Sequence, residues 1–371
     1  MLYVDHAATS PMRPEVWEAM APFVGDSFGN ASGLHGVARK AKNALEEARE
    51  QAASFLGASP MEIVFTSGGT ESDNLAVKGA ALVGGARGGV VTTAIEHEAV
   101  LESAKFLEIF GCPVAVMNPQ PSGVISIDDV LNAVTPETAV VSVMYANNET
   151  GICQPVAELA ALLNGPLLHS DAVQAFASEP LHVDNLGVDL LSLAAHKFGG
   201  PKGVGLLYVR SGTNLEPVMH GGGQELGRRS GTHNAMGAVG MTTAMASAVD
   251  QRAEFRTRME TERAAFELKM VAAGAVVTGS DVPRLPQHAH IRLPDATNET
   301  VLIRLDTAGV AAAAGSACQS GAMTVSHVLA AMGWDAEVAG GSLRFTFGWT
   351  TQPGDGLAAA EALLAAWGNT S

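Results

Sequence analysis

Short apolar runs alternate with helical segments through much of the chain, and this alternation limits the possible folds more than any other feature. Most of the runs are β-branched or leucine-rich without strict polar alternation, which is typical of strands covered on both faces. We therefore predict an α/β fold, with a mostly parallel sheet covered by helices on both faces. The expected strands are residues 63–65, 90–94, 114–117, 140–144, 167–169, 190–193 and 205–209.

Two helical patterns indicate how the chain is organised. Apolar residues recur at steps of three and four from Leu34 to Phe55 with charged residues between them, which predicts an amphipathic helix that ends at Gly57. From about Asn234 a long Ala- and Glu-rich helical stretch is followed by shorter strands and helices. We expect a large α/β domain over residues 13–250 and a smaller α+β domain formed by residues 1–12 and 251–371.

Composition excludes several classes of protein. With 371 residues, 47% hydrophobic and 16% charged, the chain has the make-up of a globular enzyme. Its formal charge of −16 argues against a nucleic-acid ligand. Three cysteines without a Cys-x-x-Cys pair predict neither a disulfide framework nor a structural zinc site. No apolar run approaches the ~20 residues that span a bilayer, and no secretory pattern opens the chain, so we expect a cytoplasmic protein without a membrane partner.

A lysine closely follows one of the predicted strands. Lys197 comes after the run at residues 190–193 and before the pair Gly199 and Gly200. Ligands bind at the carboxyl ends of strands in such folds. A desolvated amine in that position can have a lowered pKa and form a Schiff base with a carbonyl. A surface lysine in a glycine-rich loop is the alternative explanation.

Four other predicted strands are also followed by polar segments. Asp171, after residues 167–169, can pair with a pyridinium nitrogen, and Gln174 can reach a ring hydroxyl. Gly69 and Thr70 open a helix, whose N-terminus favours phosphate. His97 can stack on a planar ring, and Asn148 can offer an amide to a carboxylate. Taken alone, each segment has a simpler explanation: an N-cap at Asp171, turns at the other two loops, and a structural histidine at His97. Five such segments at one edge of a sheet predict a cofactor site.

Two residues in the last third of the chain extend this site. Arg344 lies in a predicted strand between apolar residues, where an inward-facing guanidinium needs an anion such as an α-carboxylate. An edge-strand arginine in water is the alternative. Cys318 lies among small residues in segment 314–322, which is typical of an accessible, reactive thiol. Cys112 and Cys153 are expected to be small hydrophobic residues.

Together these motifs resemble the cysteine desulfurases of the class V aminotransferase-like branch of fold type I pyridoxal phosphate enzymes. The resemblance runs from Tyr3 to Gly348. It rests on Gly69-Thr70-Glu71-Ser72-Asp73-Asn74, Glu96-His97, Asn147-Asn148-Glu149-Thr150-Gly151, Asp171-Ala172-Val173-Gln174, His196-Lys197, Arg229-Ser230-Gly231-Thr232 and Ser316-Ala317-Cys318. With Ser326-His327-Val328-Leu329 following it, the cysteine segment is similar to the subgroup with a longer cysteine loop.

The resemblance implies a cofactor, a substrate and a set of residue roles. Pyridoxal 5'-phosphate would be the cofactor and L-cysteine the substrate. Catalytic roles are implied for Lys197 as carrier of the cofactor and base, His97 as its assistant, and Cys318 as sulfur acceptor. Cofactor contacts are implied for Gly69, Thr70, His97, Asp171, Gln174, His196, Lys197 and Thr232, and substrate contacts for Asn148 and Arg344.

The resemblance also implies partners. Members of the family are homodimers, so Thr232 would reach the phosphate bound by the second subunit. The sulfur would pass to an acceptor protein, such as an iron–sulfur scaffold or a thiolation enzyme. Ala194 departs from the family pattern, because a serine that bonds the phosphate is common there, and one such bond contributes about 1 kcal/mol or more. Other departures are Ala31, Val325 and Trp349.

Two alternatives remain at the level of the sequence. A selenocysteine lyase or another C–S lyase shares the same cofactor residues and differs in the cysteine loop. A sulfur-carrier or scaffold protein without catalysis is the alternative from another class, and it would not require a bound cofactor.

Overall fold

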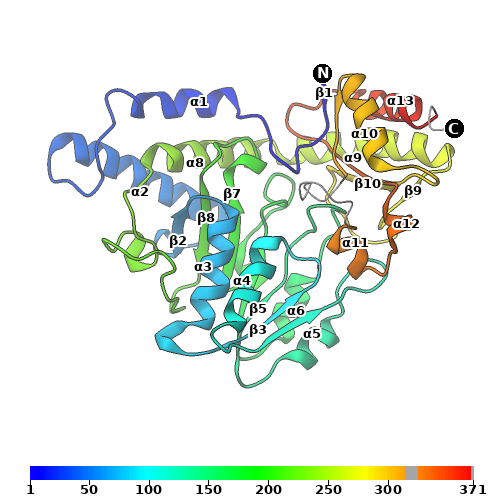
Figure 1. The fold of residues 1–371 in the computed structure, drawn as a ribbon. Coiled ribbons are helices and arrows are strands. Elements are labelled where there is room, and N and C mark those ends of the chain that lie inside the picture. The colour runs from blue at the N-terminus through cyan, green and yellow to red at the C-terminus, as the bar shows by residue number, and fades with distance from the viewer. Residues whose placement is uncertain (315–324, 369–371) are drawn as a thin grey trace.

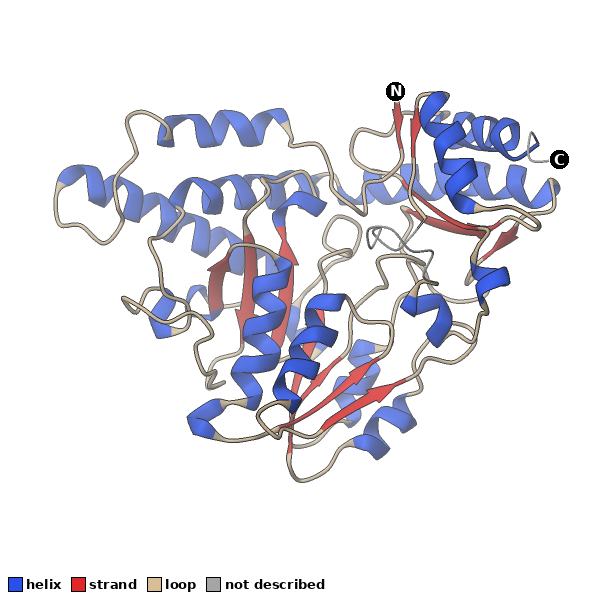
Figure 2. Ribbon diagram, in the orientation of Figure 1, coloured by secondary structure: helices blue, strands red, loops and turns tan. Residues whose placement is uncertain are grey.

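The computed structural model describes residues 1–314 and 325–368, and its centre is a seven-stranded sheet flanked by helices (Figures 1 and 2). The strand order is β2-β8-β7-β6-β5-β3-β4. The strands are β2 (Ile63–Thr66), β3 (Gly89–Thr93), β4 (Val114–Met117), β5 (Thr138–Ser142), β6 (Leu167–Asp171), β7 (Leu190–Ala194) and β8 (Gly205–Val209). Within this sheet β8 alone runs opposite to the other strands, so the predicted mostly parallel α/β fold is confirmed.

Helices cover this sheet and also form part of the smaller core described below. They are α1 (Pro14–Met20), α2 (Gly36–Leu56), α3 (Gly69–Ala81), α4 (Glu98–Glu108), α5 (Ile127–Ala133), α6 (Val156–Leu162), α7 (Val183–Leu186), α8 (Ala235–Asp250), α9 (Arg252–Ala272), α10 (Asn298–Thr307), α11 (His327–Ala331), α12 (Ala336–Ala339) and α13 (Asp355–Gly368). Of the described part of the chain, no helix is both long and apolar enough to cross a membrane.

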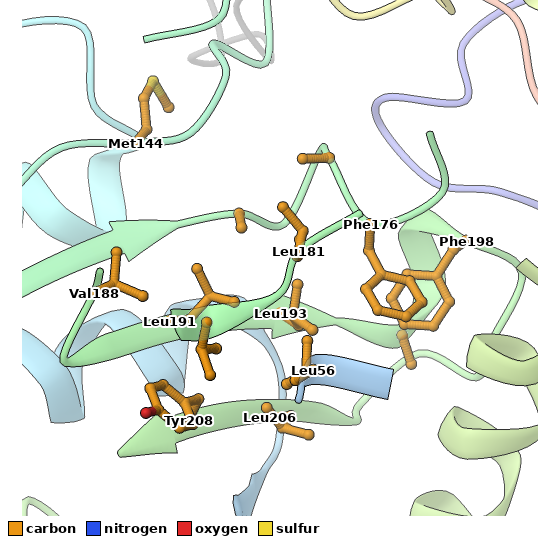
Figure 3. Packing of buried hydrophobic residues seen from close by; sticks show 14 of the residues in the cluster. Leu56, Met144, Phe176, Leu181, Val188, Leu191, Leu193, Phe198, Leu206 and Tyr208 are labelled. Carbon is orange, nitrogen blue, oxygen red and sulfur yellow. The ribbon is translucent and has the colours of Figure 1, made fainter. Parts of the chain in front are cut away.

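Alternate residues of the central strands pack into different cores, which explains their continuous apolar sequence. In β8, Leu206 and Tyr208 join the large cluster that contains α2, whereas Leu207 and Val209 pack on the other face with Leu75 of α3. Figure 3 shows the first of these faces, on which Leu191, Leu193, Leu206 and Tyr208 gather around Leu56. Both faces of the strands are therefore buried, as the sequence predicts.

The amphipathic helix near the N-terminus is α2, and one residue of its predicted apolar face lies elsewhere. Leu34 precedes the helix and is 93% exposed, so its inclusion was wrong. The His35 side chain accepts a hydrogen bond from the Ala38 N–H and caps the first turn instead. Gly57 ends the helix with a φ of 67°, in the left-handed region that favours glycine.

A second, smaller core lies beside the sheet. The stretch expected as one helix is two, α8 and α9, which are separated at Gln251. The smaller core joins α9, α10 and α13 to Val4 and to a three-stranded antiparallel sheet, ordered β12-β10-β9. Its strands are β9 (Val276–Val277), β10 (His288–Arg292) and β12 (Ser342–Thr346), and a parallel pair joins β1 (Leu2–Tyr3) to β11 (Val310–Ala311). The predicted domain boundaries stay a prediction.

A buried ion pair attaches a long loop to the edge of the sheet. Arg49 of α2 donates from its two terminal nitrogens to both carboxylate oxygens of Glu225, at 2.8 and 2.9 Å. The Phe65 N–H also donates to Glu225. Burial alone would raise the pKa of Glu225, but hydrogen bonds from His233 and Arg49 outweigh burial and lower the pKa to about 2.

We expect Arg49→Met to lower the free energy of unfolding by about 3–5 kcal/mol, because the buried Glu225 carboxylate loses its guanidinium partner. The double variant Arg49→Met/Glu225→Leu should recover most of that loss, since neither charge then remains. Lys105→Met is the matched control, because its ion pair with Glu102 is exposed on both sides. Denaturant titrations measure all three. An Arg49→Met effect as small as that of Lys105→Met would contradict the role of the pair.

Candidate active site

The candidate site is a cavity of about 320 Å³ at the carboxyl edge of the sheet. Asp171 is the last residue of β6, and Lys197 ends the short turn that follows β7. Because these strands are parallel, their carboxyl ends meet at one edge. The cavity is lined by Ala7, Ala8, Gly69, Thr70, Asp73, His97, Met144, Ala146, Asn148, Asp171, Val173, Gln174, Ala194, His196, Lys197 and Arg344. The structure therefore brings together nine of the predicted residues.

Backbone carbonyls near the N-terminus hold the Lys197 amine in the lining of this cavity. Its Nζ donates to the backbone carbonyls of Ala7 at 2.5 Å and Ala8 at 2.9 Å. Burial and the positive charge of Arg344 lower the pKa of the Lys197 amine to about 8, against opposing effects of Asp171 and Asp5. An amine with this pKa is partly unprotonated near neutral pH, which a nucleophilic lysine requires.

The Asp171 carboxylate also faces the cavity. Its Oδ1 accepts a hydrogen bond from the Val173 N–H at 2.9 Å, which fixes the orientation of the side chain. Burial raises the pKa of Asp171, while the charges of His97 and Lys197 oppose the shift. A positively charged ring nitrogen would stabilise the ionised form further, so this carboxylate suits a pyridinium partner.

A buried polar network lies beneath Asp171, and our sequence reasoning missed it. His169 is fully buried and contacts Ser142 at 2.8 Å through Nδ1 and Ser192 at 3.0 Å through Nε2. Burial lowers the pKa of His169 to about 3, so the ring is neutral. Asp73 of α3 lies 3.6 Å from the same ring, and burial followed by the charge of Asp171 raises its pKa well above the usual value.

The N-terminus of α3 forms one end of the cavity. Gly69 is its first residue, and no side chain caps this end. A Cβ added to Gly69 would lie 2.9 Å from a methyl group of Val173, so the turn needs glycine. Unpaired N–H groups and the helix dipole favour a phosphate here. Thr70 follows at the cavity wall. Thr232, in contrast, is exposed and does not line the cavity of its own chain, and its predicted contact across a dimer stays a prediction.

Two histidines line the cavity with their orientations fixed. His97 caps α4, where its Nδ1 accepts the Ala99 N–H at 3.1 Å. His196 contacts the Thr9 hydroxyl at 3.1 Å through Nδ1. Burial, together with the charges of Lys197 and Lys202, lowers the pKa of His196 to about 4. A neutral His196 still has one N–H group to donate to an anion.

Substrate-binding residues were predicted at Asn148 and Arg344, and the structure brings them into contact. Arg344 donates from Nη1 to the Asn148 backbone carbonyl at 2.9 Å and from Nη2 to Asp5 at 2.7 Å. Only 6% of the Arg344 side chain is exposed. Our residue assignments missed the contacts that the N-terminal segment makes with the site, through Asp5, Ala7, Ala8 and Thr9. The family resemblance does include this segment.

The last predicted catalytic residue, Cys318, lies outside the described residues. The other two cysteines are poor nucleophiles. Cys112 is buried, and burial raises the pKa of its thiol. Burial also raises the pKa of Cys153, in this case to about 12. Neither thiol lines the cavity, so both behave as the small hydrophobic residues that the sequence predicts.

The side chains around this cavity fit pyridoxal phosphate. A lysine of lowered pKa, a carboxylate suited to a ring nitrogen and an uncapped helix N-terminus lie in one enclosure. Lys197 would hold the aldehyde carbon, Asp171 the ring nitrogen, Gly69 and Thr70 the phosphate, and His97 one face of the ring. The Gln174 side chain donates to the Ala7 carbonyl at 3.0 Å and lines the same cavity. It would lie near the ring hydroxyl of the cofactor.

Comparisons with known proteins agree with this chemistry. The model of the family described as aminotransferase class-V matches residues 2–355. The chain is 42% identical over 359 residues to the cysteine desulfurase IscS of Dictyoglomus turgidum, covering 95% of this chain and 91% of that protein. It is 44% identical over 375 residues to an IscS-like cysteine desulfurase of Mycobacterium tuberculosis, covering 98% and 95%.

Solved structures show the same fold. A NifS-like protein superposes with a TM-score of 0.90 at 34% identity, covering 98% of both chains. A structure described as SspA in complex with cysteine superposes with a TM-score of 0.83 at 35% identity, covering 94% of this chain and 99% of the other.

Proposed function

Because the chain belongs to the aminotransferase class-V family, we propose that it is a cysteine desulfurase that uses pyridoxal phosphate. It would remove sulfur from L-cysteine, release L-alanine and retain the sulfur as a persulfide on Cys318. The observation that carries this proposal is the meeting of Lys197, Asp171 and Arg344 in one cavity. Covalent attachment, an electron sink and substrate-carboxylate binding each need one of these side chains.

The roles of the chain's own residues follow from their positions. The bound cofactor supplies the electron sink that makes the substrate Cα–H bond acidic. Arg344 binds the substrate carboxylate, and Asp5 and the Asn148 carbonyl keep its guanidinium in one orientation. The Lys197 amine, once displaced by the substrate, takes the Cα proton at Nζ. The carbonyls of Ala7 and Ala8 then hold the resulting ammonium.

The sulfur leaves the substrate by nucleophilic attack. The Cys318 thiolate attacks the substrate sulfur, a new S–S bond forms, and the substrate C–S bond breaks with its electron pair returning to carbon. Protonation of that carbon gives the methyl group, and return of the proton from the Lys197 ammonium to Cα completes alanine. The persulfide keeps sulfide out of solution until an acceptor protein takes the sulfur. We further propose a homodimer, in which Thr232 reaches the phosphate of the second subunit.

Covalent attachment of added pyridoxal phosphate should depend on pH through Lys197. Only the unprotonated amine attacks an aldehyde, and the pKa of Lys197 is lowered to about 8. We expect the attachment rate to rise with pH and to level off above about 8, whereas an exposed lysine would level off near its ordinary value of about 10.4. Stopped-flow absorbance of the cofactor-free full chain measures this profile. A plateau reached only at that higher pH would contradict the proposed nucleophile.

The reaction is tested by detecting both products from purified protein, pyridoxal phosphate, L-cysteine and a reductant. Equal amounts of alanine and sulfide support a desulfurase. Sulfide with pyruvate would move the assignment to another C–S lyase, and turnover restricted to selenocysteine would move it to a selenocysteine lyase. A protein that neither binds pyridoxal phosphate nor forms alanine would be a sulfur carrier or scaffold.

A further inference from the structure

A second, much smaller cavity lies behind Lys197. It has a volume of about 20 Å³, and its wall includes Lys197, Gln174, Gln287 and His288. About 10–15 Å³ suffices for one water molecule, provided that polar partners are available. The cavity is therefore large enough for a single water and too small for a substrate.

His288 of β10 is the most unusual residue of this wall. Its ring is fully buried, and neither ring nitrogen has a hydrogen-bond partner among the described residues. The charged groups that act on the ring are all positive: Arg344, Lys197, Arg263 and Arg284. These charges and burial keep the imidazole neutral, so that one nitrogen is a hydrogen-bond acceptor and the other is a donor.

Gln287, the residue before it, leaves a second polar atom in the same wall. Its Nε2 donates to the Gln174 carbonyl at 3.2 Å, which fixes the amide. Its Oε1 is buried and has no partner among the described residues. Buried polar atoms in native proteins are almost always satisfied by protein or by ordered water, so two adjacent unsatisfied side chains at one small cavity indicate a shared polar ligand.

Lys197 has a donor for that ligand. An ammonium carries three N–H donors, and the Ala7 and Ala8 carbonyls accept two of them. We propose that His288 and Gln287 hold one water molecule in this cavity and that this water accepts the third proton of the Lys197 ammonium. His288 and Gln287 are then positioning residues that act on the lysine through the water.

The proposed water would stabilise the protonated form of Lys197. A water that accepts from Nζ favours the ammonium and opposes the effects of burial and Arg344 on the Lys197 pKa. Asp171 and Asp5 are the other groups that favour the charged form. The water site itself is independent of the reaction, whereas its value to proton transfer by Lys197 rests on the proposed function.

A high-resolution crystal structure of the cofactor-free protein tests the site directly. We expect one water within hydrogen-bonding distance of Lys197 Nζ, a His288 ring nitrogen and Gln287 Oε1. A cavity without water density, or a water that contacts neither side chain, would overturn the proposal.

A set of variants tests the effect on the lysine. In the cofactor-free full chain, His288→Leu should lower the pH midpoint for labelling of Lys197 by a small acylating reagent by about one unit, which is tenfold in its ionisation constant. His288→Asn should restore the midpoint, since an amide still accepts a hydrogen bond. Gln287→Met, measured in the same way, should shift it in the same direction.

His290→Leu is the matched control, because His290 is also fully buried on β10 but contacts Thr278 and does not line this cavity. Its midpoint should remain that of the wild type. Unchanged midpoints in both His288→Leu and Gln287→Met, or an equal shift in His290→Leu, would overturn the proposal. Failure of the wild type to bind pyridoxal phosphate would overturn the proposed function, while the labelling results would still test the water site.

Discussion

Lys197→Ala should abolish the formation of alanine and sulfide from cysteine. The variant removes the amine that attacks the cofactor aldehyde and also the base that takes the Cα proton. Loss of the proton transfer alone should cost roughly 10²–10⁴-fold in rate. Asp171, His97 and the N-terminus of α3 remain, so the variant should still bind pyridoxal phosphate, but without a covalent bond.

Covalent attachment of the cofactor and turnover of cysteine are measured separately. Borohydride reduction makes the bond between lysine and cofactor permanent, and mass spectrometry then locates it. The label should be on the peptide that contains Lys197 in the wild type and on no peptide in the variant. Lys202→Ala is the matched control, because Lys202 lies five residues further along in an exposed position. It should keep both the covalent label and the activity. Turnover by Lys197→Ala at more than a few per cent of the wild-type rate would require a different base.

Cys318→Ser should remove sulfide release while leaving the cofactor bound. A thiolate is the nucleophile in sulfur transfer, and a serine hydroxyl neither ionises near neutral pH nor forms a persulfide. The loss of both alanine and sulfide should therefore be close to complete. Cofactor absorbance and covalent attachment at Lys197 should stay at wild-type levels, because none of the residues around the candidate cavity is changed.

The other two cysteines provide controls for this prediction. Cys153→Ser and Cys112→Ser should retain both products, because burial raises the pKa of each thiol and neither lines the candidate cavity. Mass spectrometry after one turnover without reductant should find the added sulfur on Cys318 alone. Persistent sulfide release from Cys318→Ser would show that another group accepts sulfur or that the protein is a different C–S lyase.

The central sheet could be predicted because local patterns reflect burial on two faces. Apolar runs such as residues 205–209 have no alternation, and in the structure their alternate side chains enter different cores. Ends of elements were predicted less well. Leu34 continues the helical periodicity in sequence but is exposed before α2, and the break between α8 and α9 at Gln251 has no proline or glycine to mark it. Periodicity alone does not record where packing begins or stops.

The sequence by itself determined which side chains meet at the carboxyl edge of the sheet, because Lys197, Asp171 and His97 each follow a parallel strand. It thereby determined that Lys197, Asp171 and His97 share one cavity. Only the tertiary structure decided how they are held. Backbone carbonyls of Ala7 and Ala8 bind an amine about 190 residues away in the chain, and carbonyls have no identifying side chain. Likewise, the unsatisfied nitrogens of His288 become visible only when burial removes them from water.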